Sequence, residues 1–237
     1  MKKVLLLFFA VIYSANTFSQ AFTGGGNKAY RNTLINYLSE NLRVKNNKEF
    51  YEKVSGTVFV QNSFIAGRVN ESKEIVKYKY NAYNDQILIN DNNGEKYFNL
   101  LKGVGNKIQA INSKLSETYI VFKDLSTSKS QFFKHEFNTS GDKVVSLLTK
   151  QKVVYVKGKQ ATNSYQSATK PKFNRLKDQF FVSLDDRTAV EVPRSKKKFI
   201  ALFENKEKEI KTYMKENRKS HKKRNELIDI LKYYATI

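Results

Sequence analysis

Apolar residues recur along this chain with two different periods. Between Gly56 and Val192 they mostly alternate with polar residues over short stretches, as in Val76–Tyr80, where Lys77 and Lys79 separate the apolar positions. Such alternation predicts half-buried β-strands. Short strands with tight turns between them predict an antiparallel sheet, arranged as a sandwich, a meander or a partly open barrel.

The clearest local pattern lies at Phe180–Val192. Two apolar runs, 180–184 and 188–192, flank Asp185-Asp186-Arg187, which is typical of a hairpin loop. Asn93-Gly94 predicts another tight turn. The stretch Lys157–Asp178 has many Ser, Thr and Gln residues and few aliphatic ones, so a long loop is predicted there. A loop of this length is usually functional or disordered.

Helical spacing of apolar residues occurs near both ends. Tyr30–Leu42 predicts an amphipathic helix before the strands. Three further helices are predicted at Ser195–Phe203, Asn205–Asn217 and Glu226–Tyr234, with Ser195 and Asn225 as N-caps. One helix, a β-rich middle and a helical end make the expected fold class α+β.

The first 20 residues have the layout of a secretory leader. Lys2-Lys3 precedes an apolar run, Val4–Tyr13, and small and polar residues follow to Gln20. The run is shorter than the roughly 20 residues that cross a bilayer as a helix. We therefore expect a signal peptide over 1–19, with cleavage after Ser19 or after Ala15. The mature chain is then expected to have no transmembrane segment and to be periplasmic or extracellular.

The expected domains follow from these patterns. Residues 20–193 are predicted to form the N-terminal helix and the β-rich domain, and residues 194–237 a basic helical tail packed on or next to it. The chain has no cysteine, which excludes disulfides, thiolate metal sites and cysteine nucleophiles. The fold must therefore be held together by packing.

The charge points to anionic partners. The formal net charge is +21, and it is +19 without Lys2 and Lys3. A field of this sign attracts acidic lipids, lipopolysaccharide phosphates, acidic polysaccharides or nucleic acid. The alternative is a well-solvated surface of a lysine-rich protein, with no specific partner. Nucleic acid fits an exported chain least well.

The tail concentrates this charge, with 14 basic and 6 acidic residues from Arg194 to the end. The predicted anion-binding residues form two clusters: Arg194, Lys196, Lys197 and Lys198, and then Arg218, Lys219, Lys222, Lys223 and Arg224. Interleaved aromatic residues are common in proteins that bind anionic lipid or nucleic acid. The alternating Lys and Glu of 206–209 instead fit a solvated helix face.

Catalytic and metal-binding patterns are weak. His135 lies between Phe133 and Phe137 on one strand face, which favours a packed or edge histidine; a triad with Asp124 or Asp142 is the alternative. His221 lies among lysines and is predicted to belong to the basic surface. Asp185-Asp186 and 91–95 are interpreted as turns. No cofactor, metal or enzymatic activity is predicted.

Two regions resemble known proteins. Gly56–Asp85, with Gly56-Thr57-Val58-Phe59 and Tyr80-Asn81-Ala82-Tyr83-Asn84-Asp85, and Val190–Lys211, with Val190-Glu191-Val192-Pro193-Arg194, resemble an uncharacterised family of exported proteins of Bacteroidota bacteria. The resemblance implies an exported α+β protein and transfers no catalytic residue. Leu34–Val60 is also similar to the opening helix and strand of the TonB C-terminal domain, but the later part of that domain has no match here, so we interpret this similarity as coincidental patterning.

The sequence thus predicts a non-enzymatic binding or structural module of the cell envelope. Its basic tail is expected to contact an anionic component. An accessory protein that binds another envelope protein, by a sheet edge or the loop at 157–178, is the first alternative. A hydrolase built on His135 is the second.

Overall fold

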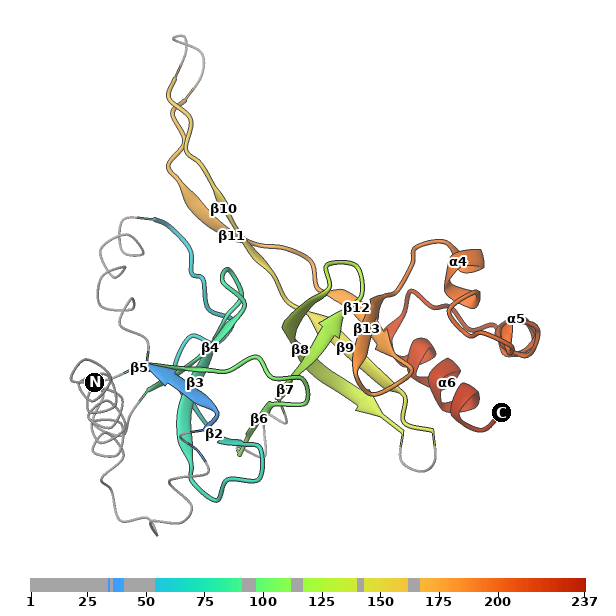
Figure 1. The fold of residues 1–237 in the computed structure, drawn as a ribbon. Coiled ribbons are helices and arrows are strands. Elements are labelled where there is room, and N and C mark those ends of the chain that lie inside the picture. Colours follow the sequence, from blue (N-terminus) through green and yellow to red (C-terminus); the bar gives the residue numbers. More distant parts are fainter. Residues whose placement is uncertain are drawn as a thin grey trace, which may run out of the picture. The chain divides into compact units, whose positions relative to one another are not determined.

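The computed structural model describes residues 34, 36–40, 54–90, 97–111, 117–139, 143–161 and 167–237 (Figure 1). The predicted signal peptide and the turn at Asn93-Gly94 lie outside these residues. The described chain is rich in strands and ends in helices, which confirms the α+β class. It forms two compact units that interleave in sequence.

The first unit lies within Met1–Leu101, Asn106–Ser116 and Val153–Arg175. Its sheet has the strand order β1-β5-β4-β3-β2-β6, and every neighbouring pair is antiparallel. The strands are β1 (Leu38–Glu40), β2 (Ile65–Val69), β3 (Val76–Asn81), β4 (Gln86–Asn90), β5 (Tyr97–Leu100) and β6 (Lys107–Ala110).

Strand β3 shows how the sequence pattern becomes packing. Val76, Tyr78 and Tyr80 are buried, while Lys77 is exposed and Lys79 is half-buried, so the predicted alternation is confirmed. On the neighbouring strand, a Cβ at Gly67 would lie 2.5 Å from a ring carbon of Tyr78. Glycine at this position therefore allows the Tyr78 ring to pack against β2.

The predicted helix at Tyr30–Leu42 is wrong at its C-terminal end. Leu34 is helical, but Leu38–Glu40 form β1 and pair with β5, with Leu38 opposite Leu100. Leu34 and Leu38 are both buried. A spacing of four residues fits one face of a helix. A turn followed by a short strand buries Leu34 and Leu38 as well, so this spacing does not distinguish a helix from a strand.

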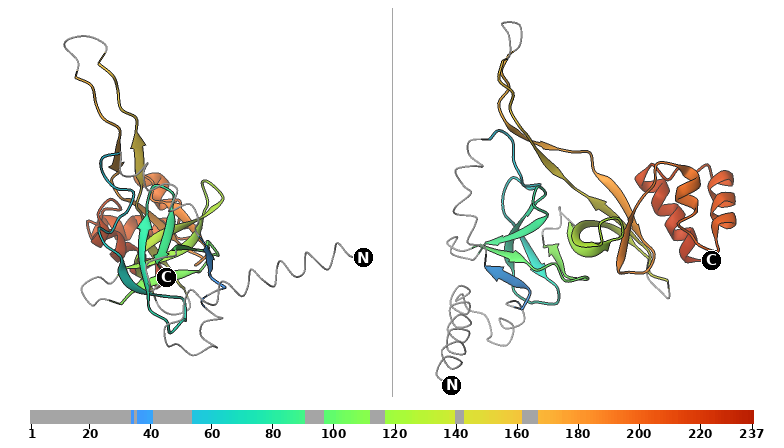
Figure 2. Two further views of the ribbon diagram at one scale, coloured as in Figure 1. Left: turned by 90° about the vertical axis from the view of Figure 1, so that its left-hand side faces the viewer. Right: turned by 45° about the horizontal axis from the view of Figure 1, so that its top comes forward.

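The predicted loop at Lys157–Asp178 is also wrong in part, because it contains a strand. β10 (Val153–Val156) and β11 (Lys172–Arg175) form a two-stranded antiparallel sheet (Figure 2). In its register Tyr155 lies opposite Phe173. In β11 only Phe173 is buried. Because most of this ribbon is exposed to solvent, its strands do not require apolar residues at alternate positions. Its sequence therefore has the polar composition that is typical of a loop.

The second unit comprises Lys102–Gly105, Glu117–Lys152 and Leu176–Ile237. Its strands pair in the order β7-β13-β12-β9-β8, and β8 pairs with β7 again, so the meander closes on itself. The strands are β7 (Thr118–Asp124), β8 (Lys129–Asn138), β9 (Ser146–Lys150), β12 (Gln179–Ser183) and β13 (Thr188–Glu191). With five strands in a meander, the first and last run in the same direction, and β7 and β13 are indeed parallel.

The predicted hairpin at Phe180–Val192 is confirmed as β12 and β13. Asp185 fixes the loop: its carboxylate accepts hydrogen bonds from the backbone N–H groups of Arg187 (3.0 Å) and Thr188 (2.7 Å). Asp186 adopts a left-handed φ of 60°. Burial raises the pKa of Asp185, but hydrogen bonds from Thr188, Arg187 and Ser183 outweigh it and hold the pKa below its ordinary value.

Three helices follow: α4 (Lys196–Ile200), α5 (Glu207–Glu216) and α6 (Arg224–Ala235). Their apolar faces pack on Val145, which directly precedes β9, and on Leu147 of β9 and Val182 of β12. The buried helical-region residues of this cluster are Phe199, Phe203, Ile210, Met214, Leu227, Ile230 and Leu231. The predicted N-cap of the last helix, Asn225, is wrong. Lys223 is the N-cap, and helix α6 begins at Arg224.

Candidate anion-binding surface

The first basic cluster lies at the start of helix α4. Ser195 caps the helix, as predicted, and its side chain accepts a hydrogen bond from the Lys198 N–H at 3.5 Å. Phe199 is fully buried, which turns one side of this short helix toward the core. Arg194, Lys196, Lys197 and Lys198 all remain exposed.

The second basic cluster occupies the connection between α5 and α6. Arg218 has a left-handed φ of 52°, and the Lys219 N–H donates to the Met214 carbonyl at 3.0 Å, which ends α5. The Ser220 N–H donates to Glu226 at 2.7 Å, which fixes the connection to the first turn of α6. This stretch is therefore ordered by bonds to both helices.

His221 joins the two clusters. Its ring stacks on Phe199, with 4.9 Å between ring centroids and 17° between planes. Its Nε2 lies 3.1 Å from the Arg194 carbonyl oxygen. Since a carbonyl oxygen only accepts, Nε2 must carry the hydrogen. The prediction that His221 belongs to the basic surface is wrong, because its residue is only 4% exposed and packs in the core between the clusters.

Three of the nine predicted residues have acidic partners. Lys219 lies 2.7 Å from Asp229, Lys223 lies 2.9 Å from Glu226, and Arg224 lies 2.9 Å from Glu136. A hydrogen bond to Asp229 raises the pKa of Lys219. Hydrogen bonds from Lys223 and from the Ser220 N–H lower the pKa of Glu226.

The other six form what we call the basic surface: Arg194, Lys196, Lys197, Lys198, Arg218 and Lys222. Each is exposed, and none makes an ion pair with another residue that the structure describes. The two segments that carry these residues are connected by the buried side chains of Phe199 and His221. The sequence prediction included all six. Of the three paired residues, only Lys223 has a local signal, Glu226 three residues later, that could have separated it.

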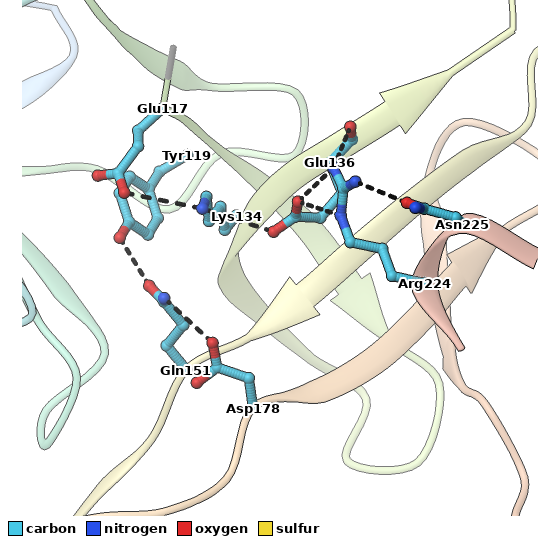
Figure 3. Close-up of polar contacts among 8 residues, drawn as sticks. All are labelled: Glu117, Tyr119, Lys134, Glu136, Gln151, Asp178, Arg224 and Asn225. Carbon is cyan, nitrogen blue, oxygen red and sulfur yellow. Dashed lines mark hydrogen bonds and ion pairs between the residues drawn. The ribbon is translucent and has the colours of Figure 1, made fainter. Parts of the chain in front are cut away.

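A chain of polar side chains ties α6 to the closed sheet (Figure 3). Lys134 lies between Glu117 (3.7 Å) and Glu136 (3.6 Å), and Glu136 in turn accepts a hydrogen bond from Arg224 at 2.9 Å. Because the carboxylate of Glu136 pairs with the Arg224 guanidinium, Arg224 attracts an external anion less strongly than its exposure suggests.

A second polar contact lies within the same unit (Figure 3). The Tyr119 hydroxyl donates to Gln151 at 2.7 Å, and the Gln151 side chain reaches Asp178 at 3.5 Å. Gln151 is only 4% exposed, so the Tyr119 bond satisfies a buried amide. No local sequence pattern indicates either set of contacts, because most of the contacting residues are far apart in the sequence.

The structure describes two of the candidate catalytic residues, Asp124 and His135. Asp124 is 5% exposed, and its carboxylate accepts from Ser126, Thr127 and Gln131 in the turn between β7 and β8. His135 lies on β8 opposite Thr118 and Leu148, as predicted for a strand histidine. Asp142 and residues 91–95 lie outside the described residues. Within the described part of the chain, no group of three or more His, Cys, Asp or Glu side chains is placed to hold a metal ion.

The first unit has a pocket of about 510 Å³ that sequence reasoning missed. It lies at the ends of β2 and β6, and its lining includes Arg68, Lys73, Lys107 and Glu71. Lys107 and Glu71 pair across 3.5 Å, which offsets part of the positive charge.

Comparison of the chain with protein-family models, with curated proteins and with solved structures found no match. The resemblance to exported Bacteroidota proteins therefore stays a prediction. None of the helices in the described residues is long and apolar enough to cross a membrane.

Proposed function

We propose that this protein is a non-enzymatic module of the cell envelope that binds phosphate groups displayed on an anionic membrane surface. Lipopolysaccharide and acidic phospholipids both offer this chemistry. The basic surface of the second unit makes the contact. The predicted signal peptide supports the envelope location.

One observation carries the proposal: six exposed cations come from two segments that are joined through the buried His221, and none has an acidic partner among the described residues. Each Lys or Arg held near an anionic membrane contributes about 1 kcal/mol of attraction. Flexible charge runs also attract anions, but here the packing of His221 on Phe199 holds both backbone segments in place, so binding needs to order only the exposed side chains.

The test is co-sedimentation of the purified protein with vesicles of phosphatidylglycerol and phosphatidylcholine, with pure phosphatidylcholine as the neutral comparison. We expect binding to the anionic vesicles only. Raising the salt to 1 M should release the protein, because the Debye length falls from about 10 Å at 0.1 M to about 3 Å.

The variant replaces all six residues of the basic surface with Gln, and we expect it to lower the bound fraction by at least about tenfold. A matched control replaces six exposed lysines elsewhere: Lys77, Lys123, Lys129, Lys208, Lys211 and Lys215. It removes the same net charge and should retain most of the binding.

An equal loss in both variants would contradict the proposal, because net charge alone would then explain the attraction to the vesicles. Salt-resistant binding would contradict it too, and would favour a protein partner.

A further inference from the structure

The β10–β11 hairpin of the first unit carries a second concentration of positive charge. Residues 153–175 contain five basic and no acidic residues. Of these, Lys157, Lys159, Lys170 and Lys172 are exposed and make no ion pair with another described residue. We call the described part of this hairpin, residues 153–161 and 167–175, the cationic ribbon.

The ribbon is a formed structure beyond its named strands. Lys159 and Thr169 exchange two backbone hydrogen bonds of 3.0 and 2.8 Å, and the Lys159 N–H also lies 3.1 Å from the Thr169 hydroxyl. Residues along one side of a strand recur about every 7 Å. Val156 pairs with Lys172 and Lys159 pairs with Thr169, so the four lysines come from both segments of the ribbon over one short stretch. They therefore lie along a narrow two-stranded ribbon rather than on a broad patch.

The root of the ribbon is fixed to the first unit. The Phe173 N–H donates to the Ser55 carbonyl at 2.8 Å, and the Val153 N–H donates to the Ala82 carbonyl at 3.1 Å. Gly56 adopts φ 85°, and a Cβ there would lie 2.5 Å from the Phe173 carbonyl oxygen. Only glycine permits this close approach, so the attachment of the ribbon is specified by sequence.

Aromatic rings gather at this root. Phe173 contacts Tyr83 edge-on at 5.3 Å and Tyr155 at 5.7 Å. The two tyrosines keep 41% and 36% of their surface exposed. Exposed tyrosine next to a row of lysines offers a face for a sugar ring and charges for its acidic groups.

We infer that the cationic ribbon binds a linear acidic polysaccharide, as a site distinct from the basic surface. A polymer with charge on successive sugars can follow the row of lysines, whereas a flat membrane would meet only part of a narrow ribbon. Proteins that hold single-stranded nucleic acid usually stack successive bases on aromatic rings along the track. In the described ribbon, aromatic residues occur only at the root, at Tyr155 and Phe173, so a polysaccharide fits better.

The probe is polygalacturonate, a linear polyuronate, titrated against the full purified protein at low salt. The ribbon variant replaces Lys157, Lys159, Lys170 and Lys172 with Gln. We expect its affinity to fall by about tenfold or more, because the local field that concentrates the polymer is lost. The control replaces Lys77, Lys123, Lys129 and Lys208, which are also exposed, and should change the affinity by less than about twofold.

The outcome separates this site from the proposed membrane contact. The variant of the basic surface should keep its affinity for polygalacturonate, and the ribbon variant should keep its binding to anionic vesicles. The inference is overturned if polygalacturonate does not bind, or if the ribbon variant and its control lose equal affinity. It is also overturned if oligothymidylate of equal charge binds more tightly and depends on the same four lysines.

Discussion

The basic surface and the cationic ribbon are built from the same residue types but are held in opposite ways. The basic surface lies over a hydrophobic core, and three neighbouring cations, Lys219, Lys223 and Arg224, are paired with acids. The ribbon has no acidic residue and is held mainly at its root. The arrangement of the charged residues in the basic surface therefore depends on packing across a whole unit. In the ribbon it depends on a few contacts around Phe173.

The largest expected effect comes from removing the support of the basic surface. Phe199→Ala should lower the free energy of unfolding by about 3–5 kcal/mol, because it leaves a cavity where a fully buried ring contacted Phe203 and His221. Urea unfolding followed by circular dichroism measures it. A helical tail that melts separately, with the sheet unaffected, would show that the packing is not cooperative.

The corresponding change in the ribbon should be smaller and more local. Phe173→Ala should cost about 3 kcal/mol at most, the low end for this substitution, because the ring lies at the edge of its unit against two exposed tyrosines. We expect faster hydrogen exchange of the Phe173 N–H and faster proteolysis in the ribbon. Equal protection in the variant and the parent would mean that backbone bonds alone hold the root.

These two regions also show how far the sequence leads. Lys196, Lys197 and Lys198 were identified as exposed cations because a run of lysines cannot be buried without partners. Lys219 and Arg224 have the same sequence character, yet Asp229 and Glu136 pair with them across 10 and 88 residues. Such pairs depend on tertiary structure, and no local pattern contains them.

The errors in the fold have a similar origin. The hairpin of β12 and β13 was predictable because two apolar runs flank a polar loop, in which the Asp185 carboxylate accepts a hydrogen bond from the Thr188 N–H. Strand β11 was missed because a ribbon exposed to solvent has no apolar face to detect. His221 was misplaced because its lysine neighbours are exposed while its own ring turns inward onto Phe199.

A third prediction tests the link between the basic clusters. His221→Ala should cost about 1–3 kcal/mol, since it removes the ring stacked on Phe199 and leaves the Arg194 carbonyl without its donor. His221→Gln should recover part of this, because an amide can donate to the same oxygen. Thermal unfolding of both variants measures the difference. Identical losses for Ala and Gln would indicate that the hydrogen bond contributes nothing.

A fourth prediction concerns acid stability of the closed sheet. Burial raises the pKa of Asp124, but hydrogen bonds from Ser126 and Thr127 outweigh it, so the pKa in the folded protein is lowered. A lowered pKa stabilises the fold above the unfolded value of about 3.9, and this contribution disappears as the pH falls through the folded pKa. Asp124→Asn should therefore cost about 1–2 kcal/mol at pH 7 and progressively less below about pH 4. A difference independent of pH between 7 and 3 would contradict this origin.

The smallest effect sharpens the comparison of paired and unpaired cations. Glu136→Gln removes the charge that balances Arg224, so the variant should bind phosphatidylglycerol vesicles about two- to fivefold more tightly, equivalent to about 0.4–1 kcal/mol. The control is Glu191→Gln, which changes charge by the same amount on an exposed strand residue of the same unit. An equal gain in both would show that only net charge matters.

The interleaving of the two units has a consequence for the order in which the protein can be made. Residues 153–175 complete the first unit, but they are encoded between β9 and β12 of the second. A chain that emerges N-terminus first cannot finish its first unit until residue 175 is available, and the ring of strands stays open until β13 follows. Both units therefore expose unpaired strands until late in synthesis, when such edges are most prone to wrong pairing. Neither unit can be obtained by truncating the chain at a single point.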